Sequence, residues 1–198
     1  TVTKLYNGLE ANSQNHRGPL SFDFMAITDF LSPLLGAGFY YKTFMWPKAF
    51  WEKFYEPAIR KSAGLGTLST EADPDTYDKG FRHCDILIIG SGATGLSAAL
   101  TAAESGAKII LADEDFLMGG RLNSETNEID GIAGSEWAKK TVAKLGAMEN
   151  VTLMSDTTIF GAYDHGIYGA IENRASEARE DNDKPRQVNW RIYTKRAI

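Results

Sequence analysis

The sequence has one cysteine, no long uninterrupted apolar run and no excess of basic residues. A lone thiol, Cys84, cannot form an internal disulfide, so an oxidising compartment is not indicated and we expect a cytoplasmic protein. The longest apolar stretch, residues 30–51, contains two prolines and two lysines, which is not typical of a membrane-spanning helix. No secretory signal is visible at the first residues. The net charge of -5 disfavours nucleic acid and anionic membranes as partners.

Groupings of residues that bind metals or form nucleophiles are also missing. His16, His83 and His165 are dispersed, and no spacing joins them to Cys84 as a metal site. No Ser-His-Asp grouping or pair of carboxylates has a spacing typical of catalysis. We therefore expect no metal ligand and no catalytic residue in this chain, and a packing role for Cys84.

The composition is that of a folded, water-soluble protein, with 43% hydrophobic and 24% charged residues. Residues 1–79 form an aromatic-rich extension that ends in a turn-forming run with Pro, Asp and Gly, and residues 80–198 have the pattern of a dinucleotide-binding domain. The chain starts at a threonine and closes inside an expected strand, so we expect a fragment of a longer protein, truncated at its C-terminus.

Within the extension, a helix is predicted after Trp46, because Pro47 suits a first helical turn. Apolar residues then recur at four-residue spacing, and the helix is expected to end near residues 64–66. Such a broad apolar surface has to be covered. Two alternatives remain open: residues 39–55 dock onto another subunit, or they pack into a core within the chain.

From residue 80 the pattern is strand, helix, strand. Residues 85–89 and 108–112 are short β-branched runs typical of buried parallel strands, and the small residues of 93–105 between them predict a helix. A helix over 135–148, with Ser135 as N-cap, and a strand over 151–154 follow. The expected fold is α/β: a Rossmann-like parallel βαβ dinucleotide-binding unit, incomplete, of the two-dinucleotide-binding flavoprotein type.

The last part of the sequence predicts a small antiparallel meander. Residues 157–163 and 166–172 form an expected hairpin, and alternating apolar residues predict a further strand over 187–198. Between them, residues 173–186 mix both charge signs without an apolar face, which favours an exposed loop.

The motif that carries chemistry is G-x-G-x-x-G, formed by Gly90, Gly92 and Gly95 between an expected strand and helix. The first glycine permits the tight turn, the second lets the backbone approach a diphosphate, and the third lets helix and strand pack closely. The helix N-terminus then favours the negative charge of the phosphates. In this context the motif indicates a site for the ADP half of NAD or FAD.

Three carboxylates stand at the end of the second expected strand. Asp113 follows Gly90 by 113 − 90 = 23 residues, near the spacing of the acid that binds the ribose in dinucleotide folds. Glu114 and Asp115 come next and would repel a 2′-phosphate, so NAD or FAD is preferred over NADP. The alternative for Glu114 and Asp115 is simple solvation.

A second glycine pair follows, in which Gly120 is expected to approach the diphosphate from its other side. Arg121 comes next and can donate two hydrogen bonds to a phosphate or ribose. Its alternative partners are the carboxylates of Glu125 and Asp115.

Several runs of the sequence resemble the alpha subunit of heterotetrameric sarcosine oxidase, and the likeness covers nearly the whole chain. They include the aromatic run at 38–47, the glycine motif at 90–95 and the runs at 77–81, 119–122, 163–169 and 190–193. The likeness also includes shorter runs at 51–53, 55–57, 63–66 and 160–161.

The resemblance implies an oxidoreductase that converts sarcosine, O2 and tetrahydrofolate to glycine, H2O2 and methylene-tetrahydrofolate. It further implies FAD and FMN in the full complex, NAD in this chain, and as partners the beta, gamma and delta subunits with the rest of the alpha chain. In that case this chain holds NAD without catalysing the reaction. The alternatives are an FAD-binding fragment of an opine or amine oxidoreductase and a non-catalytic assembly module. The residues expected to contact the cofactor are Gly90, Gly92, Thr94, Gly95, Asp113, Glu114, Asp115, Gly120, Arg121, Thr158 and Ile159.

Overall fold

The computed structural model divides the chain into two compact units, Tyr6–Ala72 and Asp73–Ile198, the second joined by Thr1–Leu5. Each unit is considered by itself. The structure describes residues 4, 5, 7, 9, 18, 19, 21–34, 36–39, 46–64, 70, 72–174 and 184–198.

The unit Asp73–Ile198 is built on a six-stranded sheet with the order β5-β2-β1-β8-β7-β6. β1 pairs in parallel with β2 and with β8, and β2 pairs in parallel with β5. β7 lies antiparallel to both β6 and β8. The strands are β1 (Tyr77–Ile89), β2 (Ile109–Ala112), β5 (Val151–Met154), β6 (Thr157–Tyr163), β7 (Ile167–Asn173) and β8 (Gln187–Ala197).

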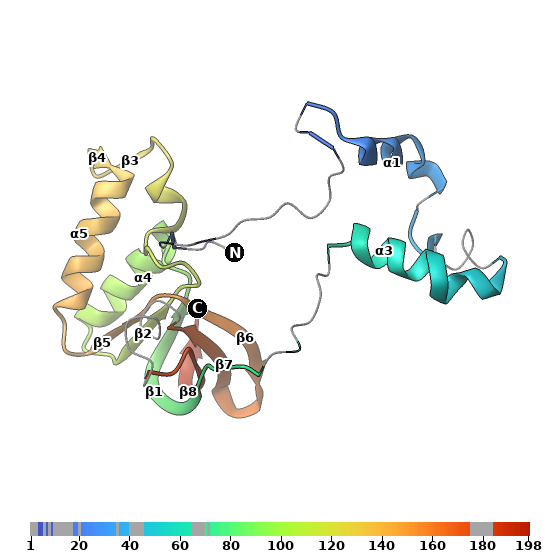
Figure 1. Ribbon diagram of the computed structural model, residues 1–198. Coiled ribbons are helices and arrows are strands. Elements are labelled where there is room, and N and C mark those ends of the chain that lie inside the picture. Colours follow the sequence, from blue (N-terminus) through green and yellow to red (C-terminus); the bar gives the residue numbers. More distant parts are fainter. Residues whose placement is uncertain are drawn as a thin grey trace. The chain divides into compact units, whose positions relative to one another are not determined.

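Two helices, α4 (Ala93–Glu104) and α5 (Gly134–Gly146), lie side by side on one face of the β5–β2–β1 half of the sheet (Figure 1). Their fully buried side chains include Leu96 and Leu145, which join Ile88 and Leu111 of the strands in one core. The predicted βαβ unit is therefore confirmed. One detail differs: α5 begins at Gly134 with Ala133 as N-cap, so Ser135 lies inside the first turn instead of capping it.

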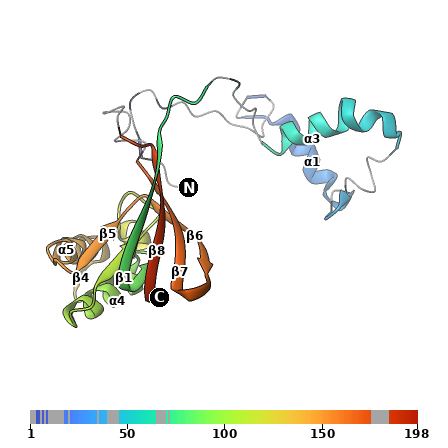
Figure 2. The same cartoon turned by 90° about the horizontal axis from the view of Figure 1, so that it is seen from below.

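The sequence predicts a separate meander, but β8 joins the meander to the parallel sheet. Tyr77 pairs with Gln187 and Leu87 pairs with Ala197, so β1 and β8 run side by side along most of their length (Figure 2). This pairing lengthens β1, which begins at Tyr77 and not at residue 85. It also places the beginning of the strand before the expected boundary at 79/80.

A second core fills the opposite face of the sheet, where β1, β2 and β5 meet the meander. Leu87, Ile110 and Ile192 are almost fully buried in it, and Cys84 belongs to the same cluster. The predicted hairpin turn is confirmed, since residues Asp164–Gly166 form a short 3-10 turn (η6) between β6 and β7. The predicted loop at 173–186 lies in part outside the described residues.

Short elements complete this unit on the side of the helices. They are a 3-10 turn, η5 (Gly120–Asn123), and a two-stranded ribbon of β3 (Glu128–Ile129) and β4 (Ile132–Ala133). η5 packs against α5, and this contact fixes the loop that follows β2. The loop carries the second glycine pair.

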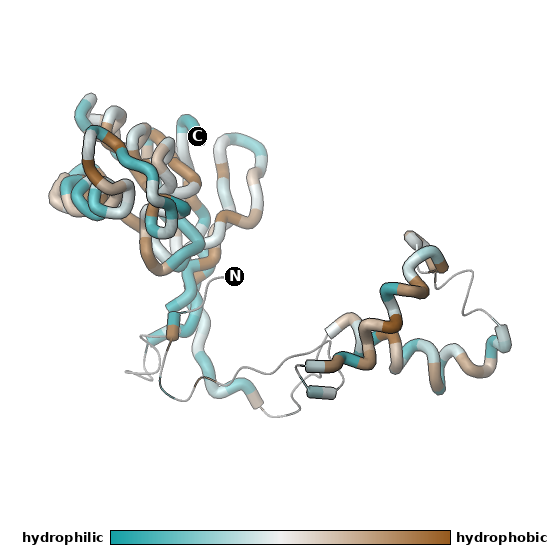
Figure 3. The backbone as a smooth tube through the Cα atoms, turned by 90° about the horizontal axis from the view of Figure 1, so that it is seen from above, coloured by the Kyte–Doolittle hydropathy of each residue, from teal (hydrophilic) through white to brown (hydrophobic). Residues whose placement is uncertain are grey.

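The described part of the unit Tyr6–Ala72 contains short helices. The predicted helix after Pro47 is confirmed, although it starts as a 3-10 turn and continues as a π turn before it becomes regular. Hydrophobic segments lie along these helices (Figure 3), yet none of their described residues is buried within the unit. The helices are η1 (Phe24–Ala26), α1 (Ile27–Phe30), η2 (Ser32–Leu34), η3 (Lys48–Phe50), η4 (Trp51–Tyr55) and α3 (Glu56–Ser62).

In the described part of the chain, no helix has both the length and the apolar character needed to cross a membrane.

Candidate functional site

The glycine motif forms the turn between β1 and α4. Gly90 has a φ of 97°, a backbone angle that favours glycine, and its N–H donates to the carbonyl of Ala112 over 2.8 Å. The chain then extends to Gly92, which is the N-cap of α4. Because β1 and β2 are hydrogen-bonded here, the turn lies at the carboxyl edge of the parallel sheet, where α/β folds bind ligands.

The surface above this turn is open. A Cβ built on Gly90 or on Gly92 would meet no other atom within 4 Å. No side chain caps the N-terminus of α4, so its first amide groups have no partner from a cap. Uncapped helical amides beside an open backbone surface fit a diphosphate, which needs close approach and several N–H donors. These residues therefore fit the ADP half of a dinucleotide.

The second glycine pair lies against the first loop. Gly119 and Gly120 both have positive φ angles, 127° and 53°. A Cβ on Gly120 would lie 3.3 Å from the Cα of Gly92, so the two backbones approach each other closely. The structure thus brings the two loops together, and the predicted approach of Gly120 to a diphosphate stays a prediction.

The guanidinium of Arg121 forms an ion pair with a carboxylate of the same chain. Its Nε lies 2.7 Å from Oε1 of Glu125, and the side chain of Arg121 is 91% exposed. This is one of the two alternatives that the sequence left open. An exposed pair of this kind contributes at most about 1 kcal/mol, so the guanidinium remains available to a phosphate, and its cofactor contact stays a prediction.

A pocket of about 340 Å³ adjoins the first loop and is wide enough for one end of a small ligand. Seven of the eleven residues that are predicted to contact the cofactor line this pocket. They lie in β6, in the second glycine loop or directly after β1 and β2. The residues that line it are Ile89, Gly90, Ala112, Asp113, Glu114, Asp115, Gly120, Thr157, Thr158 and Ile159. We call this the adenosine pocket, after the ligand that we propose for it below.

The carboxylate of Asp113 points at the glycine loop. Its Oδ2 accepts hydrogen bonds from the backbone N–H of Ser91 over 2.5 Å and from the Ser91 hydroxyl over 2.6 Å. Its Oδ1 accepts from the N–H of Asp115 over 2.9 Å. The sequence predicts that this acid holds a ribose, whereas these bonds hold the protein's own loop.

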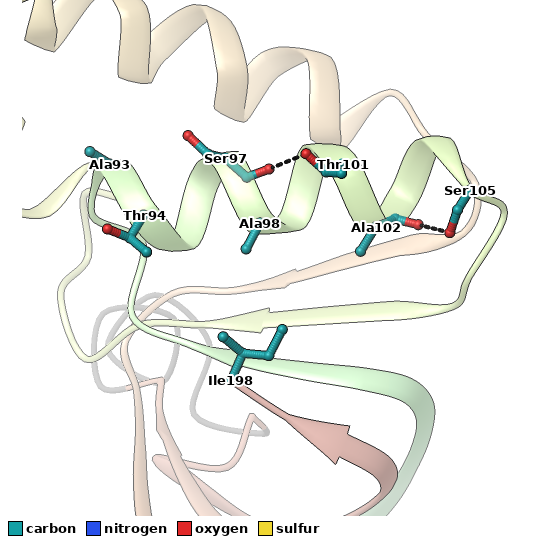
Figure 4. Close-up of a pocket in the computed structure, with 8 residues that line it drawn as sticks. All are labelled: Ala93, Thr94, Ser97, Ala98, Thr101, Ala102, Ser105 and Ile198. Atoms are coloured by element: carbon teal, nitrogen blue, oxygen red, sulfur yellow. Dashed lines mark hydrogen bonds between the residues drawn. The ribbon is translucent and has the colours of Figure 1, made fainter.

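Thr94 lies outside the adenosine pocket. It borders a different pocket, about 820 Å³ in volume, which is lined by α4, its C-cap residue Ser105 and Ile198. Figure 4 shows this pocket, in which Ala98 and Ala102 project from α4 on the side where Ile198 lies. Thr94 therefore does not share the adenosine pocket with the predicted contacts that line it, and its role stays a prediction.

Two polar residues of the site, Ser91 and Thr157, were missed by reasoning from the sequence. Ser91 is fully buried, and its hydroxyl joins Asp113 to the N–H of Gly119. Ser91 occupies a position that the G-x-G-x-x-G motif leaves open to any residue. The only signal in the sequence was therefore that its side chain carries a hydroxyl. Thr157, also buried, donates its N–H to the carbonyl of Asp113 over 2.7 Å.

His83, His165 and Cys84 do not converge on a common site. His83 stacks on Tyr193 with ring centroids 4.9 Å apart, His165 lies in the η6 turn, and His16 lies outside the described residues. Burial raises the pKa of the Cys84 thiol, which favours the packing role predicted for it. Within the described ranges, no group of three or more His, Cys, Asp or Glu side chains is arranged to hold a metal ion.

Asp156, which joins β5 to β6, carries an unfavourable charge near the pocket. Burial raises the pKa of its carboxyl, the charge of Lys4 opposes this, and the carboxylates of Glu172 and Asp115 add to the rise. A carboxyl whose pKa is raised on folding favours the folded state when it is protonated. The folded state therefore loses stability as the pH rises from the ordinary pKa of the carboxyl toward neutrality.

Asp156→Asn is expected to stabilise the protein at neutral pH. Asn tolerates the φ of 51° at this position, and it removes the charge that burial opposes. We expect the midpoint of thermal unfolding to rise by about 2 °C, as a few tenths of a kcal/mol would produce. The gain should shrink as the pH is lowered below the raised pKa of the Asp156 carboxyl, because the carboxyl itself is then protonated.

Asp130→Asn is the matched control, because Asp130 has a φ of 53° and is exposed. It tests the backbone effect alone and should leave the midpoint unchanged. A lower midpoint for Asp156→Asn at neutral pH, or an equal gain at all pH values, would contradict the account of the Asp156 charge.

The sequence is similar to a known protein family and to known proteins. Residues 85–180 match the family of FAD dependent oxidoreductases. The alpha subunit of sarcosine oxidase from Rhizobium meliloti (strain 1021) is 52% identical over 199 residues, which cover 100% of this chain and 20% of that protein. The alpha subunit from Corynebacterium sp. (strain P-1) is 41% identical over 112 residues, which cover 56% of this chain and 12% of that protein.

Among solved structures, L-proline dehydrogenase from P. horikoshii matches with a TM-score of 0.46 at 23% identity, covering 61% of this chain and 22% of that protein.

The parallel sheet and the glycine turn define a Rossmann-type α/β unit, and residues 85–180, within this unit, match the family of FAD dependent oxidoreductases. The fold class predicted from the sequence is confirmed. The chain is a homologue of the sarcosine oxidase alpha subunit, as the sequence resemblance predicts. It spans 20% of the length of the Rhizobium meliloti relative.

Proposed function

We propose that the unit Asp73–Ile198 binds the ADP half of an adenine dinucleotide, with the diphosphate between the two glycine loops. The observation that carries this proposal is the open backbone surface at Gly92, which faces Gly120 and the uncapped start of α4. Adenosine would then occupy the adenosine pocket, beside Thr158 and Ile159 of β6. The helix dipole and the free amides would supply the favourable electrostatics.

The dinucleotide proposed for this chain is NAD, following the likeness to the sarcosine oxidase alpha subunit. The carboxylates at 113–115 support NAD over NADP, because a 2′-phosphate beside them would be repelled. FAD is the second candidate, and the match of residues 85–180 to FAD dependent oxidoreductases favours it. Both cofactors share the ADP half, so the same loops would serve either one.

For the whole protein we propose sarcosine oxidation, with O2 as electron acceptor and tetrahydrofolate as acceptor of the one-carbon unit. The redox chemistry would be supplied by FAD and FMN, and this chain's residues would bind and orient a dinucleotide without reacting themselves. The identity of 52% to a sarcosine oxidase alpha subunit supports this proposal.

The unit Tyr6–Ala72 is proposed to pack against another subunit of the same complex. Its described residues expose large apolar side chains, among them Phe30 of α1 at 89% and Trp46, which precedes η3, at 84%, and the described helices bury none. Apolar surface of this extent is typical of a protein interface. The relatives are themselves subunits by name, which favours a subunit as the occupant.

One purification of the full-length protein with its associated chains tests these proposals. Acid release of the cofactors, followed by mass analysis, should give NAD in equal amount to the alpha chain, in addition to any flavin. Flavin without NAD would support the FAD alternative, and no adenine nucleotide would contradict the proposed site. The alpha chain should elute with other subunits; a monomer whose aromatic residues are buried would contradict the proposed interface.

A further inference from the structure

The carboxylate of Asp113 has little capacity left for a ligand. It accepts three hydrogen bonds, two from Ser91 and one from Asp115, and a carboxylate offers about four acceptor sites. The residue is also only 9% exposed. A group that holds both hydroxyls of a ribose has to accept two hydrogen bonds, so Asp113 would have to release one of its own.

These bonds connect three separate segments of the site. Ser91 lies in the first glycine loop, Asp113 directly follows β2, and the N–H of Gly119 donates to the Ser91 hydroxyl over 2.9 Å. Ser91 is fully buried, so water does not compete for these bonds. The chain Asp113–Ser91–Gly119 therefore sets how closely the second glycine loop approaches Gly92.

Glu114 differs from Asp113 both in its exposure and in its hydrogen bonds. It is exposed, and it lines the adenosine pocket next to Asp113. Among the residues that the structure describes, no hydrogen bond or ion pair engages its carboxylate. Both of its oxygens can thus accept from a ligand, and it lines the pocket together with Gly90 and Gly120, beside which a ribose attached to the diphosphate would lie.

We infer that the two neighbouring carboxylates have separate tasks. Asp113 and Ser91 are positioning residues that hold the two glycine loops at the spacing of a diphosphate. Glu114 is the ribose ligand, and it is the residue that discriminates a free 2′-hydroxyl from a 2′-phosphate. This inference rests on the proposed dinucleotide site.

Nucleotide analogues separate the two tasks. We would measure by calorimetry the affinities of ADP, 2′-deoxy-ADP and 3′-deoxy-ADP for the full-length protein freed of bound nucleotide. The wild type should prefer ADP over the deoxy analogues by about tenfold, the effect of one hydrogen bond to a charged group. Glu114→Gln should reduce this preference toward one. Asp113→Asn and the milder Ser91→Ala should weaken all three ligands equally and keep the preference.

Glu128→Gln is the matched control, because it makes the same change at an exposed carboxylate that does not line the adenosine pocket. It should change neither the preference nor the affinity by more than about twofold, within the ordinary range of a surface substitution.

Thermal unfolding without ligand supplies a second measurement. Asp113→Asn and Ser91→Ala should lower the midpoint, because each removes buried hydrogen bonds, whereas Glu114→Gln should not. A preference for ADP that is lost in Asp113→Asn or Ser91→Ala but kept in Glu114→Gln would overturn the inference. Failure of the wild type to bind ADP at all would instead overturn the proposed function.

Discussion

Gly92→Ala is expected to remove most of the affinity for the dinucleotide while leaving the fold intact. The added methyl group meets no protein atom within 4 Å, and the φ of −65° at this position is open to any residue. It would, however, project into the space proposed for the diphosphate. Loss of one or more hydrogen bonds to a charged group corresponds to about a 10- to 100-fold weaker affinity.

The measurement is calorimetric titration of the full-length variant with ADP, beside its thermal unfolding curve without ligand. Gly146→Ala is the control, since this helical glycine lies outside the site and an added Cβ would make only an ordinary contact, 3.6 Å from Leu153. Unchanged affinity in Gly92→Ala would show that no ligand approaches this backbone.

Gly95→Ala is expected to damage the fold itself. A Cβ at this position would overlap the carbonyl oxygen of Gly90, so α4 could not keep its place beside the turn. Overpacking against a backbone atom costs about 1–3 kcal/mol or more, which exceeds the gain of up to about 1 kcal/mol in helix propensity. We expect a lower midpoint of unfolding and loss of ADP binding together.

Gly146→Ala serves again as the reference, because it makes the same change in a helix without the overlap. Unfolding by urea would give the free-energy difference directly from the transition midpoints. A Gly95→Ala protein as stable as the wild type would contradict the close packing of α4 on the turn.

The features that follow from local sequence were predicted well. The β-branched run before Gly90 and the small residues after it give the strand, turn and helix, because their periodicity and glycine spacing act over a few residues. The carboxylates at 113–115 were expected in the site for the same reason, since they directly follow a buried strand. Thr158 and Ile159 came from the family resemblance, and the structure places both in the adenosine pocket.

The features that depend on distant segments were not predictable in this way. The pairing of β1 with β8 joins residues about 110 positions apart in the sequence, and nothing in the polar start of β1 indicates its partner. The orientation of the Asp113 carboxylate depends on Ser91, whose role requires the Gly119 loop to fold back onto the first loop. The sequence shows that a carboxylate stands at position 113. It does not show which hydrogen-bond donors that carboxylate will contact in the folded protein.

A crystal structure of the full-length protein with its dinucleotide bound would test the central claim most directly. The account predicts diphosphate oxygens about 3 Å from the backbone nitrogens at the start of α4, between Gly92 and Gly120, with the ribose hydroxyls on Glu114. A dinucleotide bound elsewhere in the protein, with the surface of Gly92 covered by another part of the chain, would contradict it.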